Sequence, residues 1–78
     1  MSKKNIENKI RFCLKQINNS NPSNDELLFE TGVLDSFDML EFILLIEKKF
    51  DIKIKPGNII LDNFSSINAI RNYIENQK

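Results

Sequence analysis

Residues 32–50 read GVLDSFDMLEFILLIEKKF, and this stretch predicts a helix from about Ser36 to Phe50. Either Asp35 or Ser36 can cap its N-terminus, because short polar side chains accept hydrogen bonds from the first free backbone N–H groups. An acid in the first turn, Asp38, and two lysines in the last turn have the signs of charge that the helix dipole favours at those ends. The stretch therefore predicts one complete helix, with a polar cap and an acidic residue at its start and basic residues at its end.

The predicted helix carries apolar side chains on two of its faces. The stripe suited to a protein core consists of Met39, Phe42, Ile43, Ile46 and Phe50. A second arc consists of Phe37, Leu40 and Leu44. A chain with three good helices can hardly bury one helix on both sides, so we interpret the second arc as a contact surface for a partner. Its expected acidic rim is Asp35, Asp38, Glu41 and Glu47. The alternative is that the second arc covers the first loop by packing on Leu27, Leu28 or Phe29.

A second amphipathic helix and a long loop precede this stretch. Apolar residues recur at helical spacing from about Ser2, a suitable N-cap, to Ile17. Cys13 lies on this apolar face and is interpreted as a small core residue. Turn-forming and polar residues fill positions 18–25 and predict a loop. The connection then contains three apolar residues expected to pin it to the core, and a glycine suited to a turn: Leu27, Leu28, Phe29 and Gly32.

The chain after the central helix predicts one short and one longer helix. Residues 52–55 alternate apolar and basic side chains, but no second strand can pair with them, so they are expected to form an extended linker. Pro56-Gly57 is expected to open a short turn or a helix of one to two turns, from Asn58 to Leu61. Either Ser65 or Ser66 can cap a last helix that ends near Glu75. The sequence therefore predicts one all-α domain over residues 1–78: a small antiparallel helical bundle of three main helices plus one short helix, with a long first loop.

Composition and charge restrict the classes of function. The 78 residues carry 11 basic and 11 acidic side chains, so nucleic acid is not an expected partner. All charged residues between Asp25 and Glu47 are acidic, which indicates a positively charged partner. One cysteine and no histidine argue against a disulfide or a structural zinc site. No signal peptide is recognisable, and the longest apolar run, residues 42–46, is too short to cross a bilayer. A cytoplasmic protein without membrane insertion is expected.

Ser36 is expected to be exposed at a helix start that favours an added negative charge, although Asp35 beside it disfavours that charge. A phosphodiester built on a serine at a helix start would lie near the unpaired N–H groups and the positive end of the dipole. No histidine is present to activate Ser36 as a nucleophile, so a modification there is expected to require a separate enzyme. The simplest alternative is that Ser36 only caps the helix.

The chain resembles the acyl carrier protein family over nearly its whole length. The resemblance consists of Gly-x-Leu-Asp-Ser at residues 32–36, an apolar residue after it, and a helix ending in Glu-x-x-Phe at residues 47–50. It continues through Asp51-Ile52-x-Ile54 and, more loosely, through Asn63-Phe64-Ser65-Ser66-Ile67 and Ala69-Ile70-x-x-Tyr73-Ile74.

The resemblance implies that Ser36 receives 4′-phosphopantetheine covalently from a separate phosphopantetheinyl transferase. The chain, not itself an enzyme, would hold an acyl or aminoacyl group as a thioester on this arm. A loading ligase would supply the group, a downstream transferase would accept it, and the carrier would work as a monomer. The positions that partners touch in the family correspond here to Asp35, Phe37, Asp38, Leu40, Glu41 and Leu44.

The charge pattern departs from that of typical fatty-acid carriers. Those carriers are acidic along the second helix and beyond, whereas here lysines stand at positions 48, 49, 53 and 55. This difference favours a carrier dedicated to one biosynthetic pathway, and the D-alanyl carriers of cell-wall modification share the Leu-Asp-Ser motif. Six phenylalanines against one alanine and one valine also predict a filled core. The cargo is therefore expected to be short or aminoacyl.

Three competing functions remain to be separated from the carrier. The first is an unmodified helical interaction module that docks through Phe37, Leu40 and Leu44. The second is a small nucleic-acid binder that uses the basic residues of the first helix, Arg11 among them, although these residues are expected simply to face solvent. The third, an enzyme, lacks any recognisable acid–base pair or metal-binding set in the sequence.

Overall fold

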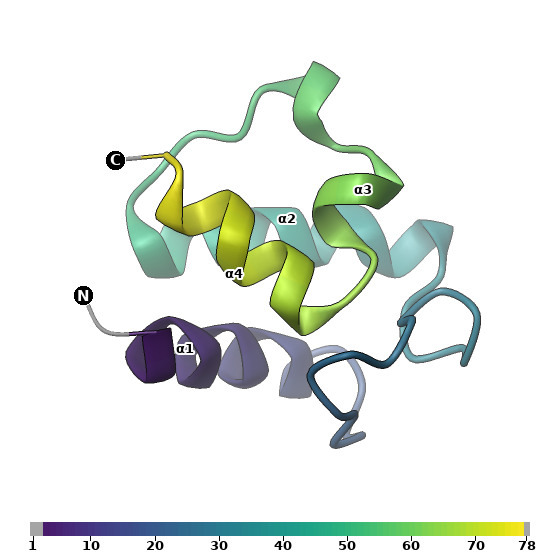
Figure 1. Ribbon diagram of the computed structural model, residues 1–78. Helices are drawn as coiled ribbons and strands as arrows, with labels where there is room; N and C mark the ends of the chain where they lie inside the picture. Colours follow the sequence, from purple (N-terminus) through teal and green to yellow (C-terminus); the bar gives the residue numbers. More distant parts are fainter. Residues whose placement is uncertain (1–2, 78) are drawn as a thin grey trace.

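A computed structural model describes residues 3–77, and within that range all regular secondary structure is helical. Figure 1 shows α1 (Lys3–Lys15) running opposite to α2 (Ser36–Phe50) and to α4 (Ile67–Glu75), with the short α3 (Leu61–Phe64) beside α4. α1 packs against both α2 and α4, and α3 packs against α4. The structure confirms the predicted all-α bundle of three main helices, one short helix and a long first loop.

The buried face of α1 is the one predicted, but the helix is shorter than expected. Its buried residues are Ile6, Ile10, Cys13 and Leu14. The helix ends at Lys15, and the Asn18 N–H donates to the Leu14 carbonyl at 2.9 Å in a closing turn. The Asn18 side chain donates to the Val33 carbonyl at 2.9 Å, so it holds the loop rather than extending the helix. The predicted start and cap at Ser2 lie outside the described residues.

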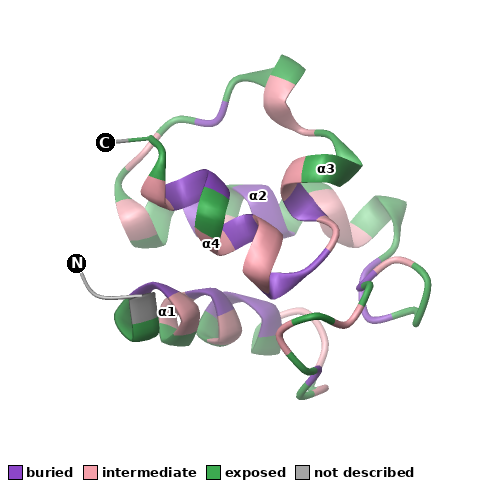
Figure 2. Cartoon of the chain, viewed as in Figure 1, coloured by how far each residue is buried: buried purple, intermediate pink, exposed green. Residues whose placement is uncertain are grey.

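The core is built mainly from isoleucine and leucine, and Figure 2 shows the buried residues where the helices face one another. Phe42 of α2 and Phe64 of α3 are fully buried, as is Ile46 of the predicted core stripe, and Ile43 of that stripe is buried as well. The other four phenylalanine rings are exposed or only partly buried: Phe12, Phe29, Phe37 and Phe50. The expectation that six phenylalanines fill the core is therefore wrong, because α1 and α2 each turn a ring toward solvent. The argument for a short cargo loses this support.

The short helix lies later in the chain than predicted. Residues Pro56–Asn58 form a 3₁₀ turn, α3 begins at Leu61, and the two residues between them are not helical. Proline at the start sets the backbone for a turn, and the Ile59 N–H donates to the Pro56 carbonyl at 3.1 Å. Shifting the helix to residues 61–64 places Phe64 at its end, where the ring is buried against Tyr73 with ring centroids 5.4 Å apart. Burial of this ring accounts for the difference from the predicted range, residues 58–61.

The second half of the long loop is pinned to the core mainly by Leu28. This side chain is fully buried, and its N–H donates to the Ser65 carbonyl at 2.9 Å. Phe29 packs partly against the core, but Leu27 is exposed, so only two of the three predicted anchors hold. Gly32 has φ = 82°, which confirms the turn for which glycine was expected.

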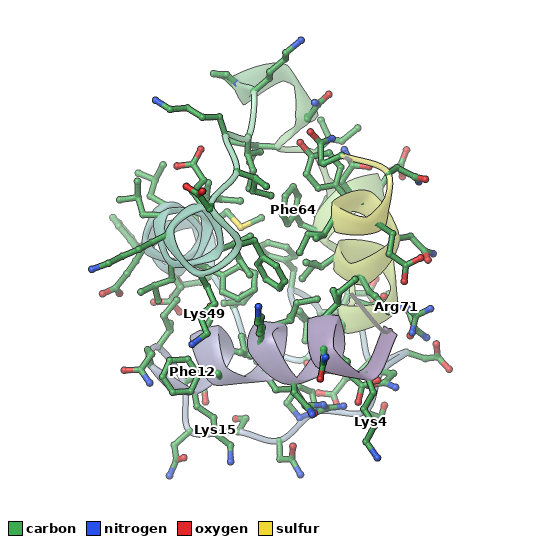
Figure 3. All side chains as sticks on the ribbon, turned by 90° about the vertical axis from the view of Figure 1, so that its left-hand side faces the viewer. Lys4, Phe12, Lys15, Lys49, Phe64 and Arg71 are labelled. Carbon is green, nitrogen blue, oxygen red and sulfur yellow. The ribbon has the colours of Figure 1, made fainter. Side chains whose placement is uncertain are left out.

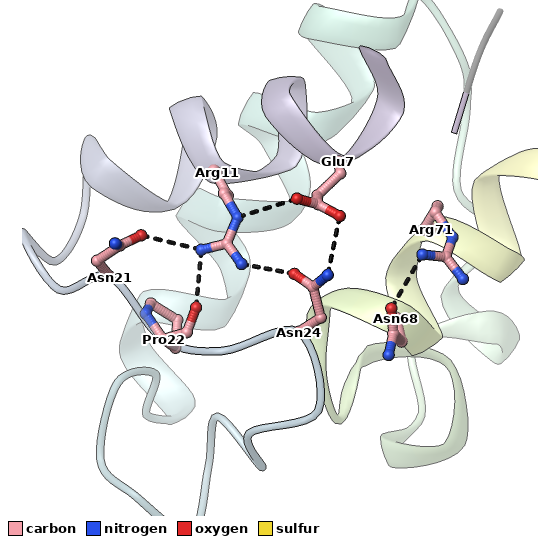
Figure 4. Close-up of polar contacts among 7 residues, drawn as sticks. All are labelled: Glu7, Arg11, Asn21, Pro22, Asn24, Asn68 and Arg71. Atoms are coloured by element: carbon pink, nitrogen blue, oxygen red, sulfur yellow. Dashed lines mark hydrogen bonds and ion pairs between the residues drawn. The ribbon is translucent and has the colours of Figure 1, made fainter. Parts of the chain in front are cut away.

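The first half of the loop is held by a polar network around Arg11 (Figure 4). The guanidinium donates to the Pro22 carbonyl at 2.7 Å and to the Asn24 side chain at 2.5 Å. Glu7 forms an ion pair with Arg11 at 3.5 Å and accepts a hydrogen bond from the Asn24 amide at 2.9 Å. The Asn24 carbonyl in turn accepts from the Asn68 N–H of α4 at 3.1 Å. This network ties the loop to both terminal helices without regular secondary structure.

Cys13 gives the fold a measurable response to alkaline pH. Burial raises the pKa of its thiol, and the nearby Lys49 opposes the increase only in part. A thiol whose pKa is higher in the folded than in the unfolded chain contributes stability that is lost as the pH rises above about 8.5. Urea unfolding at neutral and alkaline pH should show a larger loss of stability for the wild type than for Cys13→Ala. Equal losses would contradict the raised pKa.

Candidate attachment site

Ser36 is the first residue of α2 and lies directly after a firmly held segment. Leu34 is buried, its N–H donates to the Leu28 carbonyl at 3.0 Å, and Val33 beside it is also buried. Two residues later, the Ser36 side chain is exposed, and within residues 3–77 no hydrogen bond to its hydroxyl is found. The site therefore presents a free hydroxyl on a well-anchored stretch of backbone.

The helix is capped by Asp35, which settles the alternative left open by the sequence. One carboxylate oxygen, Oδ1, accepts hydrogen bonds from the N–H groups of Phe37 and Asp38, both at 2.9 Å. Ser36 is thus not needed as the cap, and its hydroxyl is available for chemistry. The same geometry corrects one expectation: two of the N–H groups thought free to face a phosphodiester are already occupied by Asp35.

Two substitutions distinguish the contribution of the capping hydrogen bonds of Asp35 to stability from the contribution of its negative charge. Asp35→Ala removes the acceptor and should lower the free energy of unfolding by about 1 kcal/mol. Asp35→Asn keeps an oxygen acceptor but removes the charge, so it should retain most of that stability. Urea denaturation of the three proteins side by side measures the difference. Equal stability of the alanine variant and the wild type would show that the two hydrogen bonds do not stabilise α2.

Phe37, Leu40 and Leu44 form an exposed apolar ridge on α2, which we call the α2 ridge. Their exposed fractions are 88%, 71% and 64%. The alternative in which they cover the first loop is therefore wrong, because residues packed on the loop would be largely buried. The exposure leaves the predicted contact with partners open to test.

The acidic residues around the α2 ridge do not all face solvent. Asp35 and Glu41 are exposed, and Asp38 is partly exposed. Glu47 instead accepts a hydrogen bond from the Ile54 N–H at 2.8 Å through its Oε2 atom. It holds the linker after α2, so one of its two carboxylate oxygens is engaged and the residue is only partly exposed. Sequence spacing could not reveal this, because the partner of Glu47 is a backbone N–H on the linker seven residues later.

Sequence reasoning missed the role of Arg11, which was interpreted as a solvent-facing base of the first helix. No periodic signal distinguishes an arginine that binds a loop from one that faces water.

Within the described residues, no group of three or more His, Cys, Asp or Glu side chains could hold a metal ion. The search of the same residues finds no helix long and apolar enough to cross a membrane.

Comparison with known proteins identifies a matching family and several proteins of similar sequence. The profile of the family described as "Phosphopantetheine attachment site" matches residues 8–74. The chain is 39% identical over 46 residues to proteins named D-alanyl carrier protein from Streptococcus sanguinis, Streptococcus gordonii and Streptococcus thermophilus. Each match covers 59% of this chain and 58% of the relative's own length. No solved structure is significantly similar.

Proposed function

The chain belongs to the phosphopantetheine attachment site family, and from this premise we propose that Ser36 is the residue that bears the group. Membership makes the chain a carrier protein with covalently attached 4′-phosphopantetheine. The observation that supports Ser36 as the attachment point is its free, exposed hydroxyl at the start of α2. Among the described serines, Ser20 donates to Asn18 and Ser66 caps α4, so their hydroxyls are engaged.

The residues around Ser36 fit a phosphodiester at that position. Its hydroxyl faces solvent, and the positive end of the α2 dipole favours an added negative charge. Two backbone N–H groups donate to Asp35, so the carboxylate beside Ser36 is itself stabilised by hydrogen bonds. The bound group supplies a terminal thiol for the thioester. The chain itself holds the serine firmly and presents a surface that partners recognise.

Conversion to the modified form tests this proposal. The unmodified protein is incubated with coenzyme A, magnesium and a broad-specificity phosphopantetheinyl transferase, and its intact mass is measured. The expected result is a mass increase of one phosphopantetheine group. A folded protein that several such transferases leave unmodified would favour the unmodified interaction module instead.

We further propose that the cargo is an aminoacyl group and that the carrier serves one dedicated pathway. The support is the similarity to proteins named D-alanyl carrier protein and the lysines at the end of α2. In this proposal a cytoplasmic ligase loads the arm, a downstream transferase accepts the group, and the carrier acts as a monomer that catalyses neither step. Incubating the phosphopantetheinylated carrier with ATP, D-alanine and a streptococcal D-alanine–carrier ligase should add one alanyl group by mass. Loading by a fatty-acyl ligase alone would overturn the aminoacyl proposal while leaving the carrier role intact.

The α2 ridge is proposed to be the surface that these partners contact. Leu44→Ala removes exposed apolar area without touching the core, so folding should be unaffected. Steady-state loading should show kcat/KM lower by about tenfold, equivalent to ~1.4 kcal/mol of lost partner contact. Leu61→Ala is the matched control, because Leu61 on α3 has a similar exposed fraction, 63% against 64%. Equal effects of the two substitutions would show that the ridge is not preferred.

A further inference from the structure

A concave surface lies between α1 and α2, toward the end of α2 that is remote from Ser36. It has a volume of about 370 Å³ and is lined by Phe12, Cys13, Gln16, Leu45, Lys48 and Lys49. Lys48 follows Ser36 by twelve residues, which places it about 18 Å further along the helix axis. We call this surface the α1–α2 groove. It is distinct from the attachment site, and the inference drawn from it rests in part on the role proposed above for the α2 ridge.

The α1–α2 groove combines an exposed aromatic ring with positive charge. Phe12 is 53% exposed, and the Lys49 ammonium lies 4.3 Å from the centre of its ring. Figure 3 shows Lys49 reaching from α2 toward Phe12 on α1. Lys9 places its ammonium 5.6 Å from the Phe50 ring on the same side of α1. No carboxylate lines the groove, and within residues 3–77 none of the lysines at positions 9, 15, 48 and 49 forms an ion pair.

We propose that the α1–α2 groove binds an acidic segment of a partner protein, with an apolar side chain beside Phe12 and carboxylates at Lys48 and Lys49. Charge complementarity is the first argument, because unpaired lysines around an exposed aromatic ring favour an anionic, partly apolar occupant. The α2 ridge supplies the second argument. Lys48 lies four residues after Leu44 and therefore on the same face of α2, so a protein seated on the ridge extends directly into the groove.

The same arrangement disfavours an anionic membrane as the occupant. Glu41 lies seven residues before Lys48, on the same face of α2, and is exposed. A flat anionic surface that reached Lys48 would also meet this carboxylate and be repelled. A peptide segment can place its acidic side chains at the lysines alone.

Nuclear magnetic resonance of the 15N-labelled full chain tests the proposal with a defined probe. The probe is a capped synthetic peptide of repeated Glu-Glu-Leu-Phe units, and its control is the same peptide with lysine in place of glutamate. The acidic peptide should cause saturable shifts of the amides of Phe12, Gln16, Lys48 and Lys49, and high salt should weaken them. Lys48→Glu combined with Lys49→Glu should weaken binding at least about tenfold.

Further variants and a third probe, phosphatidylglycerol vesicles, distinguish binding of an acidic peptide in the α1–α2 groove from other kinds of binding. Lys48→Gln with Lys49→Gln should weaken binding in the same direction, and it replaces the reversal variant if thermal melting shows that variant to be unfolded. Phe12→Ala should also weaken binding. Absence of saturable shifts, shifts confined to other residues, or equal binding of the lysine peptide would overturn the proposal. Shifts of the groove residues with phosphatidylglycerol vesicles but not with the acidic peptide would overturn it in favour of a membrane surface.

Discussion

Replacing Ser36 with alanine is expected to abolish the addition of phosphopantetheine completely. The substitution removes the only oxygen of this side chain that can form the phosphodiester. It leaves the fold intact, because Ser36 is exposed and Asp35 provides the cap. Intact mass after incubation with coenzyme A, magnesium and transferase should therefore show a folded but unmodified protein.

Ser23→Ala is the matched control for this experiment. Ser23 is also an exposed serine, but it lies in the first loop, away from the start of α2. The control should be modified to the same extent as the wild type. Persistent modification of Ser36→Ala would move the attachment to another residue and contradict the assignment. Circular dichroism of both variants ensures that a loss of modification does not reflect unfolding.

The second large effect is expected from Phe42→Ala, which should remove a large part of the stability of the domain. Phe42 is fully buried in the middle of α2, and removal of its ring leaves a cavity among packed side chains. Such a substitution costs about 3–5 kcal/mol. A chain of 78 residues is expected to have a total free energy of unfolding of about 4–12 kcal/mol. Urea denaturation should show a free energy of unfolding lower by about 3–5 kcal/mol and a correspondingly lower midpoint.

Phe37→Ala on the same helix is the control for Phe42→Ala. The Phe37 ring is 88% exposed, so its removal should change the free energy of unfolding by no more than about 0.5 kcal/mol. The pair therefore compares the same chemical change on the two apolar faces of α2. Similar losses for the two variants would contradict the assignment of one face to the core and the other to solvent.

The central helix was predicted well because all of its signals are local. Its bounds, Ser36–Phe50, follow from a polar cap, an acidic first turn and a basic last turn, and the structure has the same bounds. The core stripe follows from helical spacing, since side chains three and four residues apart share a face. The same spacing separated the α2 ridge from the core. The exposed position of Ser36 follows from its place at the helix start.

The features that were missed depend on contacts between distant segments. Glu47 looked like part of an acidic surface, but its position is decided by the Ile54 N–H on the linker. Arg11 looked like a solvent-facing base, but its position is decided by the Pro22 carbonyl and Asn24 in the loop. The register of the short helix was wrong because burial of Phe64, not a local capping signal, determines where α3 lies.

Six phenylalanines against one alanine and one valine predicted a filled core. Only Phe42 and Phe64 are fully buried. Phe12 and Phe37 lie on surfaces that the proposals assign to partners, the α1–α2 groove and the α2 ridge. Composition cannot distinguish a ring that fills a core from a ring that a partner covers. The distinction needs the three-dimensional arrangement of the helices.

Locating the modification within the chain tests the central claim most directly. The wild-type protein is converted with coenzyme A and a phosphopantetheinyl transferase, digested with a protease, and sequenced by tandem mass spectrometry. The account predicts a single phosphopantetheine group on the peptide that contains Ser36, with fragment ions that place it on that residue. A group found on Ser23 or any other residue, or no group on a folded protein, would contradict it.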